Sequence, residues 1–160
     1  MNGFIIQPLK KIHHNLVTEL LNKHWGSTMV VTRGRIHHAD KLPGFIVVMG
    51  DQIEALVTYH IDNRECEIVT LNSTVEKQGL GTALIKAVKN AAISAGCKRL
   101  WLITTNDNLA AVRFYQKRGF TLVAVHRKAI EKSRKLKPEI PLIGIDGIPI
   151  RDEIELEIVL

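Results

Sequence analysis

The sequence contains few cysteines, few aromatic residues and no long hydrophobic run. Its two cysteines, Cys66 and Cys97, have no partner at the spacing of metal ligands, which argues against a disulfide scaffold or a zinc site. The longest apolar stretches, such as residues 45–49, have the length of a strand and are too short to cross a membrane. The N-terminal residues also lack the basic start and apolar core of a secretory signal. We therefore expect a cytoplasmic protein with no bound metal and no membrane partner.

The positive charge of the chain needs an explanation. Its 160 residues suit a single domain, residues 1–160, and carry a formal net charge of +6. An excess of Lys and Arg attracts nucleic acids, but it also attracts other polyanions, including a phosphorylated cofactor. Six of the basic residues lie between Arg127 and Lys137, with no aromatic residue among them for base stacking. We interpret that segment as a solvated helix face and expect no nucleic-acid partner.

The first half of the sequence predicts mainly strands. Alternating or continuous apolar residues indicate strands at residues 4–7, 45–49, 53–61 and 65–73, the middle two joined as a hairpin by Gly50 and Asp51. Residues 12–21 repeat apolar side chains at the helical period. Residues 26–43 are polar and irregular, and a weak helix and a loop both remain open. Three antiparallel strands therefore precede the first glycine-rich loop.

The second half alternates helices and strands. Helices are expected over residues 84–95, ended by Gly96, and from Asn106 or Asn108 to Arg118, ended by Gly119. Strands are expected over residues 99–104, buried on both faces, and over residues 121–126. The last strand, residues 153–158, alternates glutamates with apolar residues, which predicts one wet, acidic face.

The loop Gln78-Gly79-Leu80-Gly81-Thr82-Ala83 lies between a strand and a helix. Helix N-termini present unpaired N–H groups, and glycine lets the backbone approach phosphate oxygens closely. A P-loop would need Gly-Lys followed by Ser or Thr, which the sequence lacks. A dinucleotide fingerprint would need a third glycine or alanine where Leu84 stands. The loop therefore predicts an anion site in a mixed sheet, with a glycine-rich turn that binds nothing as the alternative.

Two segments together resemble the GNAT superfamily of N-acetyltransferases. Residues 78–83 are similar to the family signature Gln/Arg-x-x-Gly-x-Gly/Ala through Gln78, Gly81 and Ala83. Residues 108–120 resemble the family's second recurrent stretch, Asn-x-x-Ala-x-x-Phe-Tyr followed by Gly-Phe. The resemblance implies a single α+β domain, whose mixed, mostly antiparallel and twisted sheet has about six or seven strands flanked by about four helices.

The resemblance also implies a site for acetyl-CoA as co-substrate. The pyrophosphate would lie on the glycine loop, and the pantetheine arm would pair like an added strand with the backbone near residues 71–73, where a bulge or splay is expected. Asn108 has a second interpretation as a helix cap, and Lys117 is expected near the adenosine phosphate. The implied cofactor-binding residues are Leu71, Asn72, Ser73, Gln78, Gly79, Leu80, Gly81, Thr82, Ala83, Asn108, Tyr115 and Lys117.

Attack of an amine on a thioester requires a neutral amine, a donor for the developing oxyanion and a proton for the departing thiolate. The resemblance implies Glu67 as the catalytic base, with Glu65 on the same strand face as the alternative. The structural interpretation of Glu67 is a surface carboxylate on a half-exposed strand. Tyr115 is the implied catalytic acid, and its structural interpretation is a core tyrosine beside Phe114.

We therefore expect direct transfer of an acetyl group to a primary amine, with a small molecule as the acceptor. A CoA-binding regulatory module without turnover and a protein or peptide N-acetyltransferase remain alternatives. The Pro- and Gly-rich residues 138–149 are expected to form a wall of the acceptor site.

Two further groups of polar residues receive structural interpretations. The pairs His13-His14 and His37-His38 are interpreted as surface histidines, because adjacent side chains point apart and no metal-ligand cluster supports them. The glutamates of the last strand, Glu153, Glu155 and Glu157, are interpreted as a charged edge that resists aggregation. That strand is also a possible edge for a homodimer.

Overall fold

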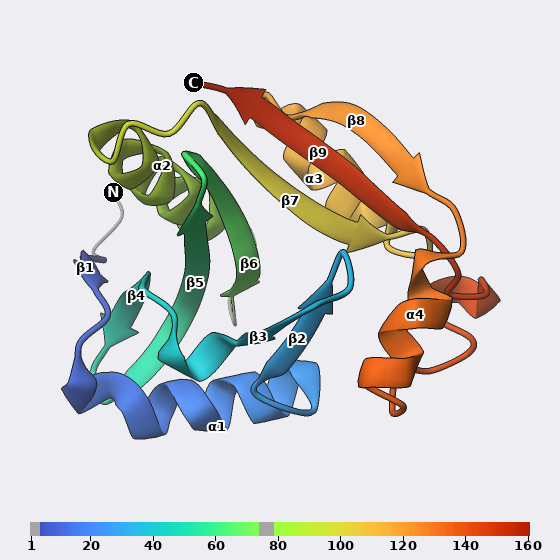
Figure 1. Ribbon diagram of the computed structural model, residues 1–160. Helices are drawn as coiled ribbons and strands as arrows, with labels where there is room; N and C mark the ends of the chain where they lie inside the picture. Colours follow the sequence, from blue (N-terminus) through green and yellow to red (C-terminus); the bar gives the residue numbers. More distant parts are fainter. Residues whose placement is uncertain (1–3, 74–78) are drawn as a thin grey trace.

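The computed structural model describes residues 4–73 and 79–160. Gln78, the first residue of the predicted signature, lies outside the described residues. The main sheet is seven-stranded and mixed (Figure 1). In spatial order its strands are β1 (Ile6–Pro8), β4 (Gly44–Met49), β5 (Gln52–Asp62), β6 (Glu65–Ser73), β7 (Arg99–Thr105), β9 (Glu153–Val159) and β8 (Thr121–His126). Among the described strands, β6 and β7 pair in parallel and the other neighbours are antiparallel.

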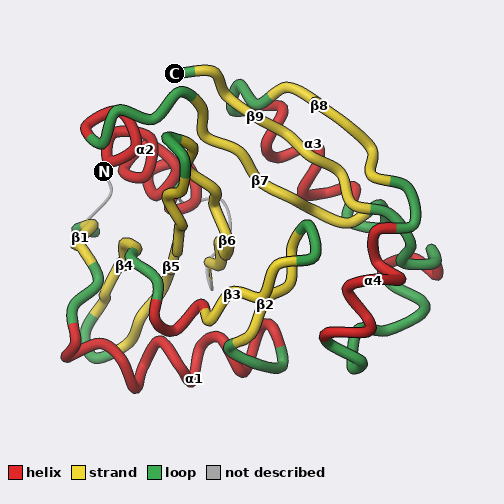
Figure 2. The backbone as a smooth tube through the Cα atoms, in the orientation of Figure 1, coloured by secondary structure: helices red, strands yellow, loops and turns green. Residues whose placement is uncertain are grey.

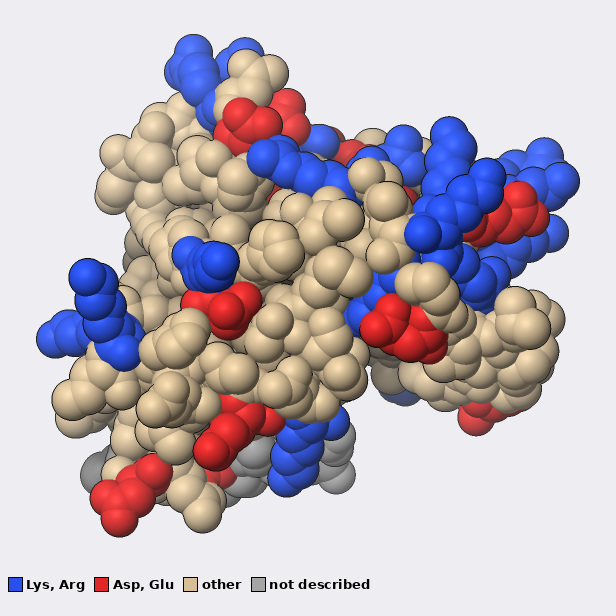
Figure 3. Space-filling view, turned by 60° about the horizontal axis from the view of Figure 1, so that its bottom comes forward, with Lys and Arg blue, Asp and Glu red and all other residues tan. Residues whose placement is uncertain are grey.

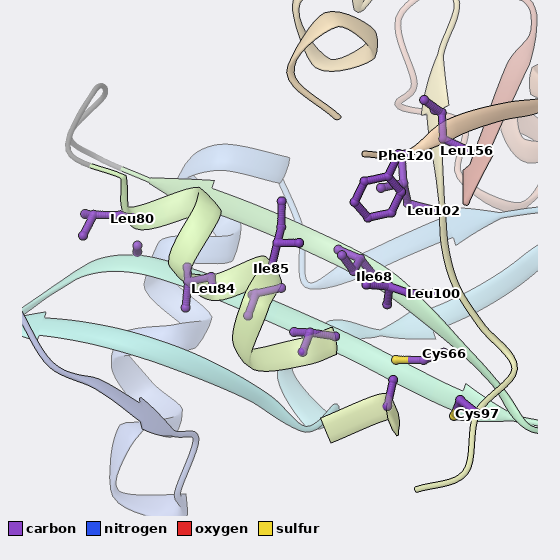
Figure 4. Packing of buried hydrophobic residues seen from close by; sticks show 14 of the residues in the cluster. Cys66, Ile68, Leu80, Leu84, Ile85, Cys97, Leu100, Leu102, Phe120 and Leu156 are labelled. Atoms are coloured by element: carbon purple, nitrogen blue, oxygen red, sulfur yellow. The ribbon is translucent and has the colours of Figure 1, made fainter. Parts of the chain in front are cut away.

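Four α-helices accompany the sheet in the described residues, as the sequence predicted. They are α1 (His14–Trp25), α2 (Leu80–Ser94), α3 (Leu109–Lys117) and α4 (Ala129–Leu136). One face of the sheet packs against α2 and the aromatic residues of α3 to form the larger core. Figure 4 shows part of this packing, in which Leu84 and Ile85 of α2 belong to the same cluster as Ile68 of β6. The opposite face packs against α1 through Val17 and Leu21.

The local stop and start signals of the helices are confirmed. Gly96 and Gly119 follow α2 and α3 with φ of 75° and 96°, the left-handed conformation that glycine adopts without strain. Asn108 caps α3, because its side-chain oxygen accepts a hydrogen bond from the Ala111 amide at 3.1 Å. These signals depend on a few neighbouring residues, which is why they can be read from the sequence.

The parallel strands β6 and β7 separate part-way along their length. Their pairing runs from Glu65 opposite Arg99 to Ile68 opposite Leu102 and then ends. On the other side of β6, the register with β5 shifts so that Val69 has no partner, which is a β-bulge. After Ile68, β6 and β7 diverge (Figure 1, Figure 2). The splay expected near residues 71–73 is present, and it leaves backbone groups of β6 without a strand partner on that side.

Residues 26–43, undecided from the sequence, contain a hairpin of β2 (Met29–Thr32) and β3 (Arg35–His38). Its turn residues Arg33 and Gly34 both have positive φ, of 50° and 72°, the pattern of a tight two-residue hairpin turn. The hairpin lies in front of the main sheet (Figure 1). The side chains of β7 (Arg99–Thr105) alternate between buried and half-buried, so the prediction of a strand buried on both faces was wrong.

The interpretation of the last strand as a charged edge was also wrong. Strand β9 lies between β7 and β8, so it is neither an edge nor available as a dimer edge. Glu153 and Glu155 are only 1% and 8% exposed. Arg33 donates to Glu153, and Arg99 and His126 bond to Glu155 at 2.7 and 2.8 Å. These partners come from distant parts of the chain, and they make the burial of the carboxylates possible. Formation of a homodimer stays a prediction.

The basic segment from Arg127 to Lys137 forms α4 and its flanks. Lys and Arg side chains gather on this side of the molecule, as Figure 3 shows. Most of the segment is exposed, as predicted, but Lys137 is buried and its Nζ donates to the Met29 carbonyl at 2.8 Å. Arg134 donates to the carbonyls of Ile140, Pro141 and Ile150, which fixes both ends of the Pro- and Gly-rich loop. In the described residues, no helix is long and apolar enough to span a membrane.

Candidate functional site

The glycine loop enters α2 through two glycines with different structural roles. Gly79 has φ of +75°, and a Cβ there would meet nothing within 4 Å, so this backbone faces open space. Gly81 lies in the first turn of α2, where a Cβ would be 2.9 Å from Cζ of Phe114 in α3. The first glycine thus provides a left-handed turn, and the second allows the two helices to approach. The two sequence motifs therefore meet in space.

A cavity of about 480 Å³ opens beside this loop. The N-terminus of α2 has no acidic residue in its first turn, so its free N–H groups and helix dipole favour an anion there. The cavity is lined by Leu71, Ser73, Gly79, Leu80, Gly81, Thr82, Ala110, Ala111, Phe114, Tyr115 and Arg118. The strand end, the glycine loop and α3 therefore enclose one site.

Arg118 holds a positive charge against the glycine loop. Its Nε donates to the Thr82 hydroxyl at 2.9 Å, and its Nη1 donates to the Phe114 carbonyl at 2.9 Å. The guanidinium also lies 3.6 Å from the centroid of the Phe114 ring. Three contacts thus fix this cation beside the N-terminus of α2.

A second cavity, of about 340 Å³, occupies the opening between β6 and β7. Residues of β6, β7, α3 and the end of α1 line it, namely His24, Trp25, Ile68, Val69, Leu71, Asn72, Leu102, Ile103, Thr104, Asn108, Ala111 and Tyr115. Leu71, Ala111 and Tyr115 line both cavities, so the two meet at these side chains. Asn72 joins the walls, because its Oδ1 accepts a hydrogen bond from Trp25 Nε1 at 2.6 Å.

Tyr115 lies where the two cavities meet. Its ring makes edge-to-face contacts with Phe114 and Phe120, at centroid distances of 5.2 and 5.4 Å. Burial raises the pKa of the Tyr115 hydroxyl above its ordinary value of 10.0. The hydroxyl therefore keeps its proton throughout the neutral range and can act as a donor. Its structural interpretation as a core tyrosine is confirmed by this packing, and its role as the catalytic acid stays a prediction.

Glu67 lies elsewhere on the sheet. It is 4% exposed, so its interpretation as a surface carboxylate was wrong. The Thr32 hydroxyl donates to Oε2 of Glu67 at 2.7 Å, and His37 Nε2 lies 3.4 Å from Oε1. His37 is itself 4% exposed, so its interpretation as a surface histidine was wrong too. The hairpin carries His37 and covers Glu67. This contact joins distant parts of the chain, so local sequence does not reveal it.

The surroundings of Glu67 are polar. It lines a small cavity of about 210 Å³ with Arg35, His60, Asp62, Asn63, Glu65 and Trp101. Glu65, the alternative base, is bound by Arg99 Nε at 3.0 Å. Glu67 and Tyr115 therefore line different cavities, on either side of the point where β6 and β7 part.

The described residues include no group of three or more His, Cys, Asp or Glu side chains that could hold a metal ion.

Residues 11–120 match the acetyltransferase (GNAT) family. The chain belongs to the GNAT family. It is therefore an acetyltransferase with acetyl-CoA as its donor and an amine as its acceptor.

Comparison with known proteins supports the assignment to the GNAT family. The uncharacterized proteins YdhI and YxbD of Bacillus subtilis (strain 168) are 46% and 43% identical over 151 and 152 residues. These alignments cover 94% of this chain in both cases, and 94% and 96% of the two relatives. A GNAT family acetyltransferase from Elizabethkingia anophelis, solved with acetyl-CoA bound, superposes with a TM-score of 0.73 at 19% identity, over 100% of both chains. The similarity to this solved structure, at 19% identity, shows a shared fold.

The GNAT cofactor fits the residues at the first cavity. The open backbone at Gly79, the helix N-terminus and Arg118 suit a pyrophosphate, because they combine N–H donors with fixed positive charge. The pairing of β6 with β7 ends at Ile68, and the edge that β6 presents after this residue suits an extended pantetheine arm.

The structure brings most of the predicted cofactor residues of this GNAT protein together. Leu71, Asn72, Ser73, Gly79, Leu80, Gly81, Thr82, Asn108 and Tyr115 line one or both main cavities. Ala83 lies one turn inside α2 and lines neither cavity. Lys117 is not brought to the glycine loop, since it lies with Leu109, Val112, Arg113 and Gln116 on another face of α3.

Arg118 is the residue of this GNAT site that the sequence analysis missed. It follows Ala111, Phe114 and Tyr115 at helical spacings of seven, four and three residues, so it shares their face of α3. Lys117 is offset from that face by one residue, which turns it away. The helical period could therefore have selected Arg118 over Lys117.

Proposed function

We propose that this acetyltransferase transfers the acetyl group of acetyl-CoA to the primary amine of a small molecule, by direct attack in a ternary complex. The observation that supports this most is the position of Tyr115, which lines both the cavity at the glycine loop and the cavity between β6 and β7. A donor in the first cavity and an acceptor in the second would meet at this hydroxyl.

The cofactor-binding roles follow from the two cavities. Backbone N–H groups around Gly79 to Thr82 and the Arg118 guanidinium would hold the pyrophosphate. Backbone groups of Leu71, Asn72 and Ser73 would pair with the pantetheine arm, and one N–H there would face the thioester oxygen. When bound, acetyl-CoA supplies an activated acetyl carbonyl.

The chemical step needs one proton acceptor and one proton donor. Glu67 takes a proton from the ammonium form of the acceptor, directly or through water, and leaves a neutral amine. The amine nitrogen would then form a bond to the carbonyl carbon while the carbon–sulfur bond breaks and its electron pair goes to sulfur. The nitrogen, positively charged after the attack, loses its second proton to solvent, as Glu67 later does with the first. Tyr115 gives its proton to that sulfur, and solvent returns a proton to the tyrosine. The sum is an amide, a free thiol and one proton released.

A covalent acyl-enzyme on cysteine is disfavoured by burial. Cys66 is fully buried, and burial raises the pKa of its thiol to about 12. Burial also raises the pKa of Cys97, which is 7% exposed. The thiolate is the nucleophilic form of cysteine, and it is scarce at neutral pH in both residues. Direct transfer is the simpler route.

The walls of the second cavity favour a small acceptor. The end of α1 is tied to β6 by the bond from Trp25 to Asn72, and to the segment after α4 by Lys137, whose Nζ donates to the Trp25 carbonyl at 3.5 Å. The cavity has a volume of about 340 Å³. A space of this size suits a compact amine better than a folded protein surface.

The test is acetyl transfer from labelled acetyl-CoA to a panel of polyamines, amino acids, aminoglycosides and peptide N-termini. We expect CoA release that depends on both substrates, with a small amine as the best acceptor. Preferential acetylation of the peptides would favour a protein acceptor. If acetyl-CoA raised the melting temperature but no amine raised CoA release above hydrolysis, a regulatory CoA-binding module would replace the enzyme.

A further inference from the structure

The carboxylate of Glu67 is held by side chains of the β2–β3 hairpin. Thr32 Oγ1 lies 2.7 Å from Oε2 of Glu67 and 3.1 Å from Nε2 of His37. The same His37 nitrogen lies 3.4 Å from Oε1 of Glu67. All three side chains are nearly inaccessible, at 7%, 4% and 4% exposure for Thr32, His37 and Glu67. A buried carboxylate of this kind depends on its hydrogen-bond partners.

The directions of these hydrogen bonds follow from the number of available protons. A hydroxyl has one proton, and Thr32 donates it to the carboxylate. The Thr32 oxygen can then only accept from His37, so His37 carries its proton on Nε2. The same nitrogen also lies 3.4 Å from Oε1 of Glu67. One oxygen of Glu67 therefore accepts a hydrogen bond from the hairpin, and the other lies near His37.

The turn between these two donors is anchored at two points. The Arg33 amide in its turn donates to both carboxylate oxygens of the buried Glu153 at 3.2 Å. Arg35 forms an ion pair with Asp62 at 3.2 Å on the neighbouring strand β5. Thr32 lies next to the first anchor and His37 lies near the second. The two donors are thus presented by a segment that is fixed to β9 and to β5.

Glu67 also lies close to the opening of the sheet. It precedes the bulge residue Val69 by two positions on β6, and Val69 lines the cavity between β6 and β7. Two residues of a strand span about 7 Å, so a short chain of water molecules can connect the carboxylate to an amine in the opening. The small cavity on the other side of Glu67 gives the proton a way out afterwards.

We propose that Thr32 and His37 are positioning residues for Glu67, and that they hold its carboxylate in the orientation needed for proton transfer from the acceptor ammonium. The inference rests on the proposed function and extends it to a hairpin that contributes nothing to the family motifs. Besides His37, the charged or titratable groups around Glu67 are Arg35, His60, Asp62, Glu65 and Arg99.

The experiment compares Thr32→Val with Thr32→Ser in pH profiles of kcat and kcat/KM for the best acceptor of the panel. Valine keeps the shape of threonine without the hydroxyl, and serine keeps the hydroxyl. We expect Thr32→Val to lower kcat by about tenfold to a hundredfold, the usual size of an impaired proton transfer. Thr32→Ser should restore the wild-type kcat. The KM for acetyl-CoA should not change.

A second pair guards against an effect of folding alone. His37→Gln keeps an N–H near the position of Nε2, and His37→Leu removes it, so only the leucine variant should match Thr32→Val. Melting temperatures show whether each variant is folded. If the wild type acetylates no amine, the proposed function fails and the inference falls with it. If the wild type is active and Glu67→Gln is impaired, but folded Thr32→Val and His37→Leu keep the wild-type profile, the inference alone is overturned.

Discussion

Gly81 of α2 and Phe114 of α3 approach so closely that a Cβ on the glycine would lie 2.9 Å from Cζ of the phenylalanine. The phenylalanine cannot retreat freely, because the Arg118 guanidinium lies 3.6 Å from its ring centroid. This contact couples the two sequence motifs and shapes the wall of the larger cavity. The short distance explains why the first motif has a glycine at position 81 where the second places the ring of Phe114.

The substitution Gly81→Ala should therefore damage both the fold and the cofactor site. We expect a loss of about 1–3 kcal/mol in the free energy of unfolding, the usual cost of overpacking, and weaker acetyl-CoA binding. Denaturant unfolding and calorimetric titration measure the two effects. Adding Phe114→Leu should recover part of the stability by making room. If Gly81→Ala matched the wild type in both measurements, the close approach would not matter.

Arg118 and Lys117 offer a matched pair, since they are adjacent cations on different faces of α3. Replacing Arg118 with Met should weaken acetyl-CoA binding by about tenfold, because a charge-assisted contact to phosphate is lost. Replacing Lys117 with Met should change the dissociation constant little. Titrations at two salt concentrations would also show a smaller salt dependence for the Arg118 variant. Equal effects of the two substitutions would argue against the assignment of Arg118.

Tyr115→Phe tests the proposed acid. The variant should keep its affinity for acetyl-CoA, while kcat falls by about a hundredfold or more. Because burial raises the pKa of Tyr115 above 10.0, its hydroxyl stays protonated through the whole neutral range. The wild-type rate should therefore show no alkaline decline from this residue below that value. A decline near neutrality that disappears in Tyr115→Phe would contradict this account.

The ion pairs of β9 predict how stability depends on acid. Burial raises the pKa of Glu155, but hydrogen bonds from Arg99 and His126 outweigh it and leave the pKa below the ordinary 4.5. A lowered pKa in the folded state contributes stability above the ordinary value, and this contribution is lost as pH falls through the folded value. Glu155→Gln should therefore lower the melting temperature at neutral pH. The difference from the wild type should shrink below pH 4.5. A constant difference across that range would show that Glu155 acts through packing.

The sequence was informative where structure depends on near neighbours. Gly96, Gly119 and the Asn108 cap lie where their local signals placed them, and the splay of β6 follows the family resemblance. Each of these features needs only a few adjacent residues or a recurring motif. The same holds for Arg118, which the helical period could have identified.

The errors about buried charged and polar side chains share one physical cause, which is pairing between distant segments. Glu153 and Glu155 look like a wet strand face until Arg33 and Arg99 are placed against them. Glu67 and His37 look exposed until the hairpin folds over the sheet. A buried charge cannot be recognised from sequence when its partner lies tens of residues away.

The central claim, direct transfer at the meeting point of two cavities, is tested most directly by initial rates. Acetyl-CoA and the best amine of the panel should be varied together, with release of free thiol as the readout. A ternary complex predicts double-reciprocal lines that intersect, and Tyr115→Phe should lower the limiting rate without changing that pattern. Parallel lines, with a labelled acetyl group retained on the protein in the absence of amine, would contradict the account.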